Sequence, residues 1–249
     1  MSAWPVRVRF WIITLAALLT VGATASLGFW QLGRGQQKTD LQAVIAERGT
    51  LPPLSGSDLA ALTLPADAMH RPVVIQGQWV QGTTIFLDNR PMNGRTGFIV
   101  LSALRLEGRA AVVLVQRGWV PRDFLERQRL PPVPSPAGIV QVQGRLAPPP
   151  SQLFELGQQA QGAIRQNVNL SQLASEWRVS LLQGISVLQT GGDLPSAWVR
   201  DWPHFVGEQH KHLAYAAQWF AMSAIAAGLY FWFQILLPRL QRRSHGQNS

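Results

Sequence analysis

Two long uncharged segments near the ends of the chain constrain its fold more than any other feature. No Asp, Glu, Lys or Arg occurs between Phe10 and Gly33, and none occurs between Leu213 and Pro238. A helix that spans a bilayer needs roughly 20 predominantly apolar residues, so each segment is long enough to cross a membrane. The sequence therefore predicts a tail at 1–9, a span at 10–33, a domain at 34–211, a second span at 212–238 and a tail at 239–249.

The distribution of charge predicts the orientation of these segments. All 13 acidic residues lie between the two predicted spans, whereas the charged side chains of the two tails are all basic. Short basic flanks stay on the cytoplasmic side of a membrane, while a long domain can be translocated whatever its charge. We therefore expect both termini in the cytoplasm and the domain outside it, although Arg34 and Lys38 follow the first span directly.

The first span has an alternative interpretation as a signal peptide. Arg7 and Arg9 precede the apolar segment, and the Ala-Thr-Ala sequence at 23–25 resembles a small-residue cleavage site. The apolar segment continues past Ala25 as far as Trp30, which favours a retained span over cleavage near Ala25.

Composition excludes several kinds of site and partner. The chain has no cysteine, which excludes disulfides, Cys-ligated zinc, iron–sulfur clusters and Cys-x-x-Cys-His haem attachment. It has no Gly-x-Ser-x-Gly elbow, no His-Glu-x-x-His helix and no Gly-rich phosphate loop, so an enzyme is a minor alternative. The net charge of +9 does not indicate nucleic acid, because the basic residues of the domain are scattered singly. Contact with membrane lipid explains the excess charge more simply.

The central domain has the pattern of β-strands from Arg71 onward. Short apolar segments bounded by Gly, Pro and Asn predict strands at 73–79, 83–88, 97–104, 111–119, 139–146, 164–169 and 179–188. Helices are predicted at 34–48, 122–127 and 170–177. We expect an α+β membrane protein in which two transmembrane helices flank a mainly β extracytoplasmic domain, a partly open barrel or sandwich with small helices.

Small residues recur along one side of each predicted span. They are Ala16, Thr20, Thr24 and Gly28 in the first span, and Ala214, Ala217, Ala221, Ala224 and Gly228 in the second. Small residues let helices approach closely in lipid, so these stripes are expected to pack the spans together or against a membrane partner. A turn of about 100° per residue then places His212, Tyr215 and Trp219 on the opposite side, away from the seam.

His212, at the start of the second span, has two interpretations. Tyr and Trp commonly line membrane interfaces, and a histidine there can simply hydrogen-bond among headgroups. Imidazole is also a common axial ligand of haem iron, and Arg or Lys can pair with haem propionates. His210, two residues earlier, is either a second ligand or a solvated boundary residue.

Four separated segments form one recognisable pattern. They are Gly-Phe-Trp-Gln-Leu-Gly-Arg at 28–34 with Lys38, Leu-Asp-Asn-Arg at 87–90 with Asn93, Gly94 and Gly97, Val-Leu-Val-Gln-Arg-Gly-Trp-Val-Pro at 113–121, and His212, Tyr215, Ala216, Trp219 and Phe220. Together they resemble the surfeit locus protein family of cytochrome c oxidase assembly factors, in the correct order over nearly the whole chain. The chain departs from the family at His210-Lys211, where members often have Asn-Asn, which leaves the role of His210 open.

The resemblance implies a non-enzymatic factor that helps to assemble the haem–copper oxidase. Bacterial members are similar to haem a-binding proteins, which hold the cofactor near the membrane before its insertion into subunit I. His212 is then the candidate iron ligand, with Tyr215 and Trp219 as pocket or partner-contact residues.

Three basic residues within the family-like segments are candidate partners of the haem propionates. They are Arg34, Lys38 and Arg117. The alternative is that Arg34 and Lys38 extend to lipid phosphates while Arg117 satisfies a β-turn.

Two functions stay open at this point. One is a carrier of haem a that acts with subunit I and haem a synthase in a bacterial inner membrane, with a periplasmic domain. The other is a cofactor-free scaffold that holds oxidase subunits and haem a synthase together during assembly.

Overall fold

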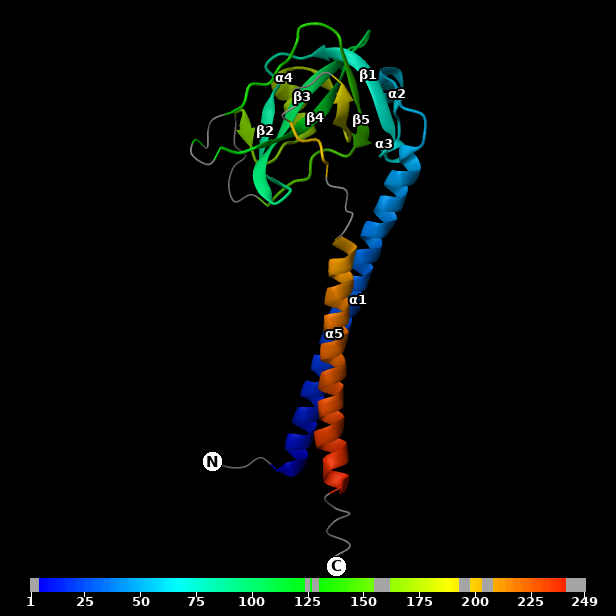
Figure 1. Cartoon of the computed structure of the whole chain (residues 1–249), viewed down its shortest axis with the longest axis vertical. Coiled ribbons are helices and arrows are strands. Elements are labelled where there is room, and N and C mark those ends of the chain that lie inside the picture. Colours follow the sequence, from blue (N-terminus) through cyan, green and yellow to red (C-terminus); the bar gives the residue numbers. More distant parts are fainter. Residues whose placement is uncertain are drawn as a thin grey trace, which may run out of the picture. The chain divides into compact units, whose positions relative to one another are not determined.

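The computed structural model describes residues 5–123, 126, 130–154, 162–192, 198–202 and 208–240, without the side chains of residues 6 and 208–211. The chain divides into two compact units. The helical unit comprises Met1–Gln42 and Phe205–Ser249, and the β unit comprises Ala43–His204. Two helices long and apolar enough to cross a membrane therefore flank a mostly β domain in the sequence, which confirms the predicted fold class (Figure 1).

The first helix, α1, is continuous from Val6–Gly49 and is 44 residues long. The predicted span and the separately predicted helix at 34–48 are thus one element. Single glycines cost a helix interior only about 1 kcal/mol each, so Gly33 and Gly35 do not interrupt it. The helix ends shortly before Pro52 and Pro53, which disfavour helical backbone at the residues that precede them.

The second long helix, α5, covers Glu208–Tyr230 and continues directly into a π-helical segment, η1, at Phe231–Leu236. Within the helical unit, α1 and α5 lie side by side and antiparallel (Figure 1). The Thr14 hydroxyl lies 3.0 Å from the Tyr230 hydroxyl, and Ser223 Oγ donates to the Val21 carbonyl over 3.3 Å.

The seam between these helices corrects the predicted packing of α5. The predicted stripe residues Ala214, Ala217, Ala221, Ala224 and Gly228 are all exposed. The seam instead uses the adjacent face of α5, where Ala216 and Ser223 are buried. On α1 the prediction is partly confirmed, because Thr24 and Gly28 are buried while Ala16 and Thr20 are exposed.

The physical reason for this rotation is the gap that Gly28 leaves on α1. The Phe220 ring fills that gap, since a Cβ built on Gly28 would lie 2.7 Å from it. The same ring packs edge-to-face on Phe29, with ring centroids 5.2 Å apart. Aromatic filling and specific hydrogen bonds therefore determine which face of α5 meets α1, and the small-residue stripe does not.

The β unit contains one eight-stranded sheet. Its strands are β1 (Pro72–Trp79), β2 (Ile85–Met92), β3 (Arg95–Leu106), β4 (Ala111–Pro121), β5 (Val140–Ala147), β6 (Ile164–Arg165), β7 (Ser180–Leu181) and β8 (Ser186–Gly192). The strand order is β6-β2-β3-β1-β5-β8-β4-β7, with β3 also paired to β4. The β1–β3 and β4–β8 ladders are short, so the sheet curls without closing into a barrel.

Three short helices accompany the sheet: α2 (Gly56–Ala61), α3 (Pro65–Ala68) and α4 (Leu170–Trp177). The predicted bounds of α4 are confirmed. The Asn169 side chain caps it by accepting hydrogen bonds from the backbone N–H groups of Ser171 and Gln172. Leu170 and Leu173 then bury their side chains in a cluster with β2, β3 and β4.

Two predicted strands are shorter or divided in the structure. Strand β6 covers only two residues of the predicted 164–169, because the Asn167 side chain bonds the backbone of Leu153 instead of continuing a ladder. The predicted 179–188 strand is divided into β7 and β8 around Gly184, which has φ +74°. In the predicted helix at 122–127, Arg122, Asp123 and Glu126 are not helical, and the other residues lie outside the described ones.

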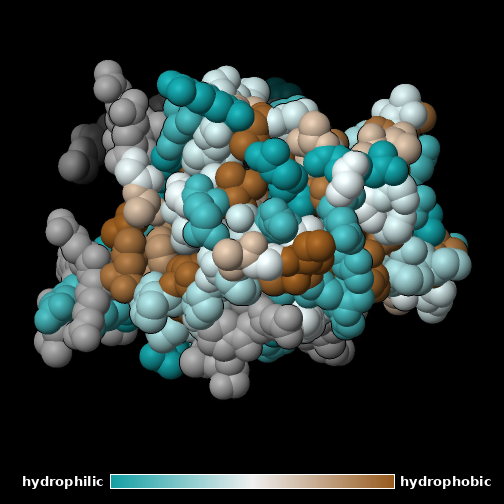
Figure 2. All heavy atoms as spheres, turned by 90° about the horizontal axis from the view of Figure 1, so that it is seen from above, coloured by the Kyte–Doolittle hydropathy of each residue, from teal (hydrophilic) through white to brown (hydrophobic). Residues whose placement is uncertain are grey.

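Hydrophobic residues form several separate patches on the face of the molecule drawn in Figure 2. Strand β4 contributes nothing to such patches over most of its length, because its residues from Val112 to Val120 are all buried. This strand therefore has covered faces on both sides, and it carries the central buried side chain of the β unit, which is described below.

We expect Gly28→Val to lower the thermal unfolding midpoint of the detergent-solubilised protein, because the new side chain would overlap the Phe220 ring. Overpacking of this kind costs roughly 1–3 kcal/mol. Gly22→Val is the matched control, since nothing lies within 4 Å of a Cβ at that position. Circular dichroism melts compare the two variants. Equal unfolding midpoints would show that Phe220 does not pack against α1 at Gly28.

Candidate functional site

His212 lies on the seam of the helical unit and not on its outer side. Its Nδ1 is 2.8 Å from Oε1 of Gln31, on α1. The predicted direction of this side chain, away from the helix seam, is therefore wrong. The same rotation of α5 that brings Phe220 against Gly28 also turns the imidazole toward α1.

An open groove of about 460 Å³ lies beside this histidine. Its lining residues are Gln31, Leu32, Gly33, Gly35, Gln36, Thr39, His212 and Leu213. Two of them are glycines of α1, so part of the wall is bare backbone. A Cβ built on Gly35 would lie 3.6 Å from Cβ of His212, so helix and histidine are already in close approach there.

The hydrogen bond determines which imidazole nitrogen can bind a ligand. An amide oxygen only accepts hydrogen bonds, so the contact through Oε1 of Gln31 requires the tautomer of His212 that carries its hydrogen on Nδ1. The lone pair of the neutral ring then lies on Nε2, the nitrogen that is free to bind a metal. Ligand histidines in proteins are commonly held in this way, through the ring N–H opposite the metal. The donor set therefore fits a single axial bond to haem iron.

Four other predicted site residues of the helical unit have described side chains, and none of the four lines this groove. Tyr215 is 54% exposed, and Trp219 is partly buried. Arg34 extends along α1, where its Nη1 donates to Gln37 Oε1 and its guanidinium lies 5.7 Å from the Trp30 ring centroid. Lys38 is partly buried on the same helix. The side chain of His210 lies outside the described residues, and the roles of all five stay predictions.

Arg117 lies in the β unit and is 1% exposed. Its guanidinium carbon is 4.1 Å from the Trp79 ring centroid and 5.4 Å from that of Trp198. Nη2 donates to the Pro134 carbonyl over 2.6 Å, and Nη1 donates to Ser135 Oγ over 3.2 Å. The guanidinium is buried between the two indole rings and bonds the chain's own loop at Pro134–Ser135, which favours a structural role over a propionate contact.

A β-bulge places this side chain in the interior. Val100 pairs with Gly118 and Leu101 pairs with Gln116, so Arg117 is the extra residue on β4. Arg117 therefore lies in the strand that was predicted at 111–119, and its side chain bonds the Pro134–Ser135 segment. Burial, and after it the charge of Arg200, lowers the pKa of Arg117 to about 10.

Arg90, from another family-like segment, is also internal. It is 6% exposed and donates to the Gln166 carbonyl and to Ser151 Oγ. The carbonyl of Arg90 in turn accepts a 2.7 Å hydrogen bond from Trp119 Nε1. These residues of the two central segments thus stabilise the β unit.

Sequence reasoning missed Gln31. It lies inside the family-like segment at 28–34, but only charged residues of that segment were considered as partners. The available signal was a polar side chain near the end of a predicted span, because such groups are costly in lipid and commonly face a partner.

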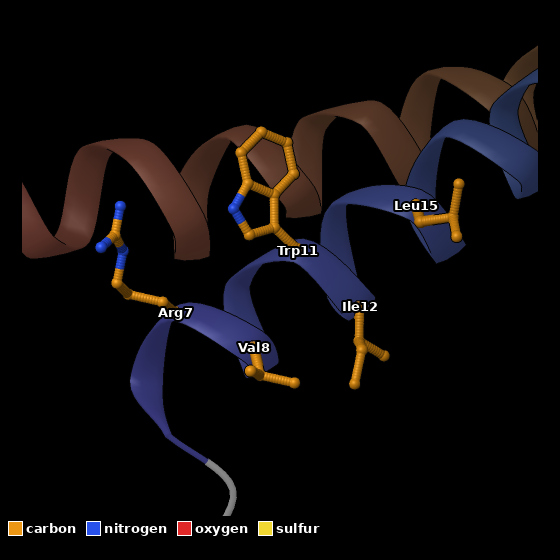
Figure 3. A pocket seen from close by; sticks show the side chains of 5 residues that line it. All are labelled: Arg7, Val8, Trp11, Ile12 and Leu15. Atoms are coloured by element: carbon orange, nitrogen blue, oxygen red, sulfur yellow. The ribbon is translucent and has the colours of Figure 1, made fainter.

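Neither the acidic and histidine side chains nor the hollow near the start of α1 forms a second site in the described part of the chain. Within the part of the chain that the structure describes, no group of three or more His, Cys, Asp or Glu residues could hold a metal ion. A hollow of about 410 Å³ on α1 is lined by Arg7, Val8, Trp11, Ile12 and Leu15. Figure 3 shows that these side chains project from one helix in different directions, without a group of converging polar atoms.

The fold and the groove together define a class of protein. It has a β domain joined to two membrane-compatible helices, and an imidazole lies beside a groove in the helical unit. The match of a SURF1 family model to residues 18–224 shows that the chain belongs to the SURF1 family. The matched region includes both Gln31 and His212. The family resemblance inferred from separate segments is thereby confirmed.

A curated relative carries a name that describes its role. Cytochrome oxidase assembly protein SHY1 from Saccharomyces cerevisiae is 26% identical over 97 residues, which are 39% of this chain and 25% of the yeast protein. The match therefore spans about a quarter of the length of the yeast protein.

We expect Arg117→Lys to destabilise the β unit by about 2–4 kcal/mol, because an ammonium cannot replace two forked donors stacked between indole rings. Arg105→Lys, at an exposed position of β3, is the matched control and should change stability little. Chemical unfolding followed by tryptophan fluorescence measures both. Equal stability of the two variants would show that the buried contacts of Arg117 do not stabilise the fold.

Proposed function

We propose that this chain is a non-catalytic assembly factor for cytochrome oxidase that holds haem a at the membrane surface and assists its insertion into subunit I. Membership of the SURF1 family supports the assembly function, and so does the name of the yeast relative, a cytochrome oxidase assembly protein. The observation that carries the haem-binding part is the imidazole of His212, which lines an open groove with its Nε2 available. Subunit I and haem a synthase are the proposed partners.

The residues around the groove suit a carrier of a flat, apolar cofactor. His212 would supply one axial bond, and Gly33 and Gly35 leave α1 backbone uncovered beside it. Leu32 and Leu213 add apolar surface at the end of the uncharged segments. When the cofactor is bound, its iron would accept the lone pair of the imidazole. One protein ligand in an open groove suits a cargo that must be released.

The proposed location follows from the distribution of charge. The tails carry basic and no acidic residues, which supports cytoplasmic termini and a periplasmic domain in a bacterial inner membrane. The groove-lining residues of the two long helices lie at the domain-proximal ends of the uncharged segments, where a farnesylated haem could stay at the lipid boundary.

A cofactor-free scaffold is the second candidate function, and one observation favours it. The small residues Ala217, Ala221, Ala224 and Gly228 of α5 are exposed and do not form the seam with α1. Such a face could pack against a helix of a partner protein in the membrane. In this case the chain would hold oxidase subunits and haem a synthase together without binding haem.

We expect His212→Ala to abolish the haem a absorbance of the detergent-purified protein when it is co-expressed with the enzymes of haem a synthesis. The matched control is Gln218→Ala, an exposed polar position on the same helix. A visible spectrum and a pyridine haemochrome measure bound haem, and a circular dichroism melt checks folding.

Two results would contradict parts of this proposal. A folded wild-type protein without haem would favour the scaffold. Haem retained by a folded His212→Ala protein would assign the iron ligand to another residue.

A further inference from the structure

The contact between His212 and Gln31 is a specific cross-helix hydrogen bond. It joins residues that are 181 positions apart in the sequence, over 2.8 Å. Both side chains are partly buried and both line the groove. Both also lie close to the ends of the uncharged segments, where the surroundings are less polar than water and a hydrogen bond is stronger.

Two residues of α1 face the histidine at this point. Gln31 and Gly35 are four residues apart, so they lie on the same face of α1. Gln31 offers the acceptor, and a Cβ built on Gly35 would lie 3.6 Å from Cβ of His212, which is ordinary van der Waals contact. The hydrogen bond to Gln31 is therefore the contact that orients the imidazole.

We infer that Gln31 is a positioning residue for His212: its amide oxygen holds the Nδ1 hydrogen, sets the tautomer and directs Nε2 to an incoming ligand. The part of this inference that concerns iron rests on the proposed haem function. The tautomer itself does not, because the hydrogen bond exists in the protein without a cofactor. Gln31 acts through His212 and touches no iron in this scheme.

A purely structural Gln31 would have different consequences. If the hydrogen bond only stabilised the helix pair, its loss would lower the unfolding temperature and leave the tautomer and ligand strength of His212 unchanged. If Gln31 positions the imidazole, its loss frees Nδ1, and the hydrogen can move to Nε2, where it blocks the bond to a metal. Outer partners of ligand histidines typically contribute 10–100-fold to affinity.

The experiment compares three substitutions with the wild type. Gln31→Leu removes the acceptor, and Gln31→Glu keeps an acceptor oxygen at the same reach. Gln218→Leu is the matched control, because Gln218 is an exposed glutamine of α5 that does not line the groove. Circular dichroism melts establish that each protein is folded.

The first readout needs no haem. Nitrogen-15 NMR of histidine-labelled protein, at a pH about two units above the ordinary histidine pKa of about 6.5, reports which ring nitrogen carries the hydrogen. The His212 signals are assigned by their loss in His212→Ala. We expect a hydrogen on Nδ1 in the wild type, Gln31→Glu and Gln218→Leu, and a mixture of tautomers in Gln31→Leu.

The second readout is titration with haem a in detergent. We expect Gln31→Leu to bind about 10–100-fold more weakly than the wild type, and Gln218→Leu to bind like the wild type. An unchanged tautomer in folded Gln31→Leu would overturn the positioning role, whatever the haem result. A wild type that binds no haem would instead refute the proposed function, while the tautomer measurement would still decide the role of Gln31. If Gln31→Leu does not fold, Gln31→Asn, which shortens the side chain by one methylene, replaces it in both measurements.

Discussion

A single buried guanidinium holds together much of the β unit. This guanidinium, from Arg117, lies against the rings of Trp79 in β1 and Trp198 after β8. It also donates hydrogen bonds to the hydroxyl of Ser102 in β3, to the Pro134 carbonyl and to the Ser135 hydroxyl. Arg200 Nε also donates to the Arg117 carbonyl. A buried cation is costly unless it is paired or fully bonded. Here indole faces and neutral oxygens take the place of a carboxylate. Nε of Arg117 is buried without a hydrogen-bond partner among the described residues, so the charge depends on these remaining contacts.

The helical unit depends on a different kind of contact. Lipid offers little hydrophobic drive between helices, so packing and interhelical hydrogen bonds select the face that pairs. The Phe220 ring enters the gap at Gly28, and Ser223 and Tyr230 find partners on α1. These contacts outweigh the Ala/Gly stripe of α5, which stays exposed. His212 belongs to the selected face and therefore meets Gln31.

This arrangement relates stability to the proposed function. The seam needs no metal, because polar and aromatic side chains complete it. The histidine contributes one nitrogen to the seam, through the bond to Gln31, and keeps the other nitrogen for a ligand. A site with one protein ligand and an open wall can be occupied and emptied without disturbing the helix pair, which is what a carrier of an insoluble cofactor requires. In the β unit Arg90 and Arg117 are buried, so neither supplies an exposed guanidinium.

Local pattern in the sequence was sufficient for several elements. The uncharged segments predicted two membrane-compatible helices, because the lack of charge over more than 20 residues leaves few other structures. Alternating apolar residues between Gly and Pro located the long strands, and Asn169 marked the start of α4. The family-like segments were sufficient to indicate the SURF1 family, which the match over residues 18–224 confirms. These features are encoded by neighbours in the chain.

Long-range contacts decided the rest. Which face of α5 meets α1 depends on one aromatic ring and one missing side chain, Phe220 and Gly28, which are far apart in the sequence. The direction of His212, the pairing with Gln31 and the burial of Arg117 at a β-bulge follow from such contacts as well. The periodicity of small residues in the sequence predicts that one face of a helix can pack closely. It does not predict which face a particular partner helix will contact. That choice is made by shape and hydrogen bonding, which exist only after the chain has folded.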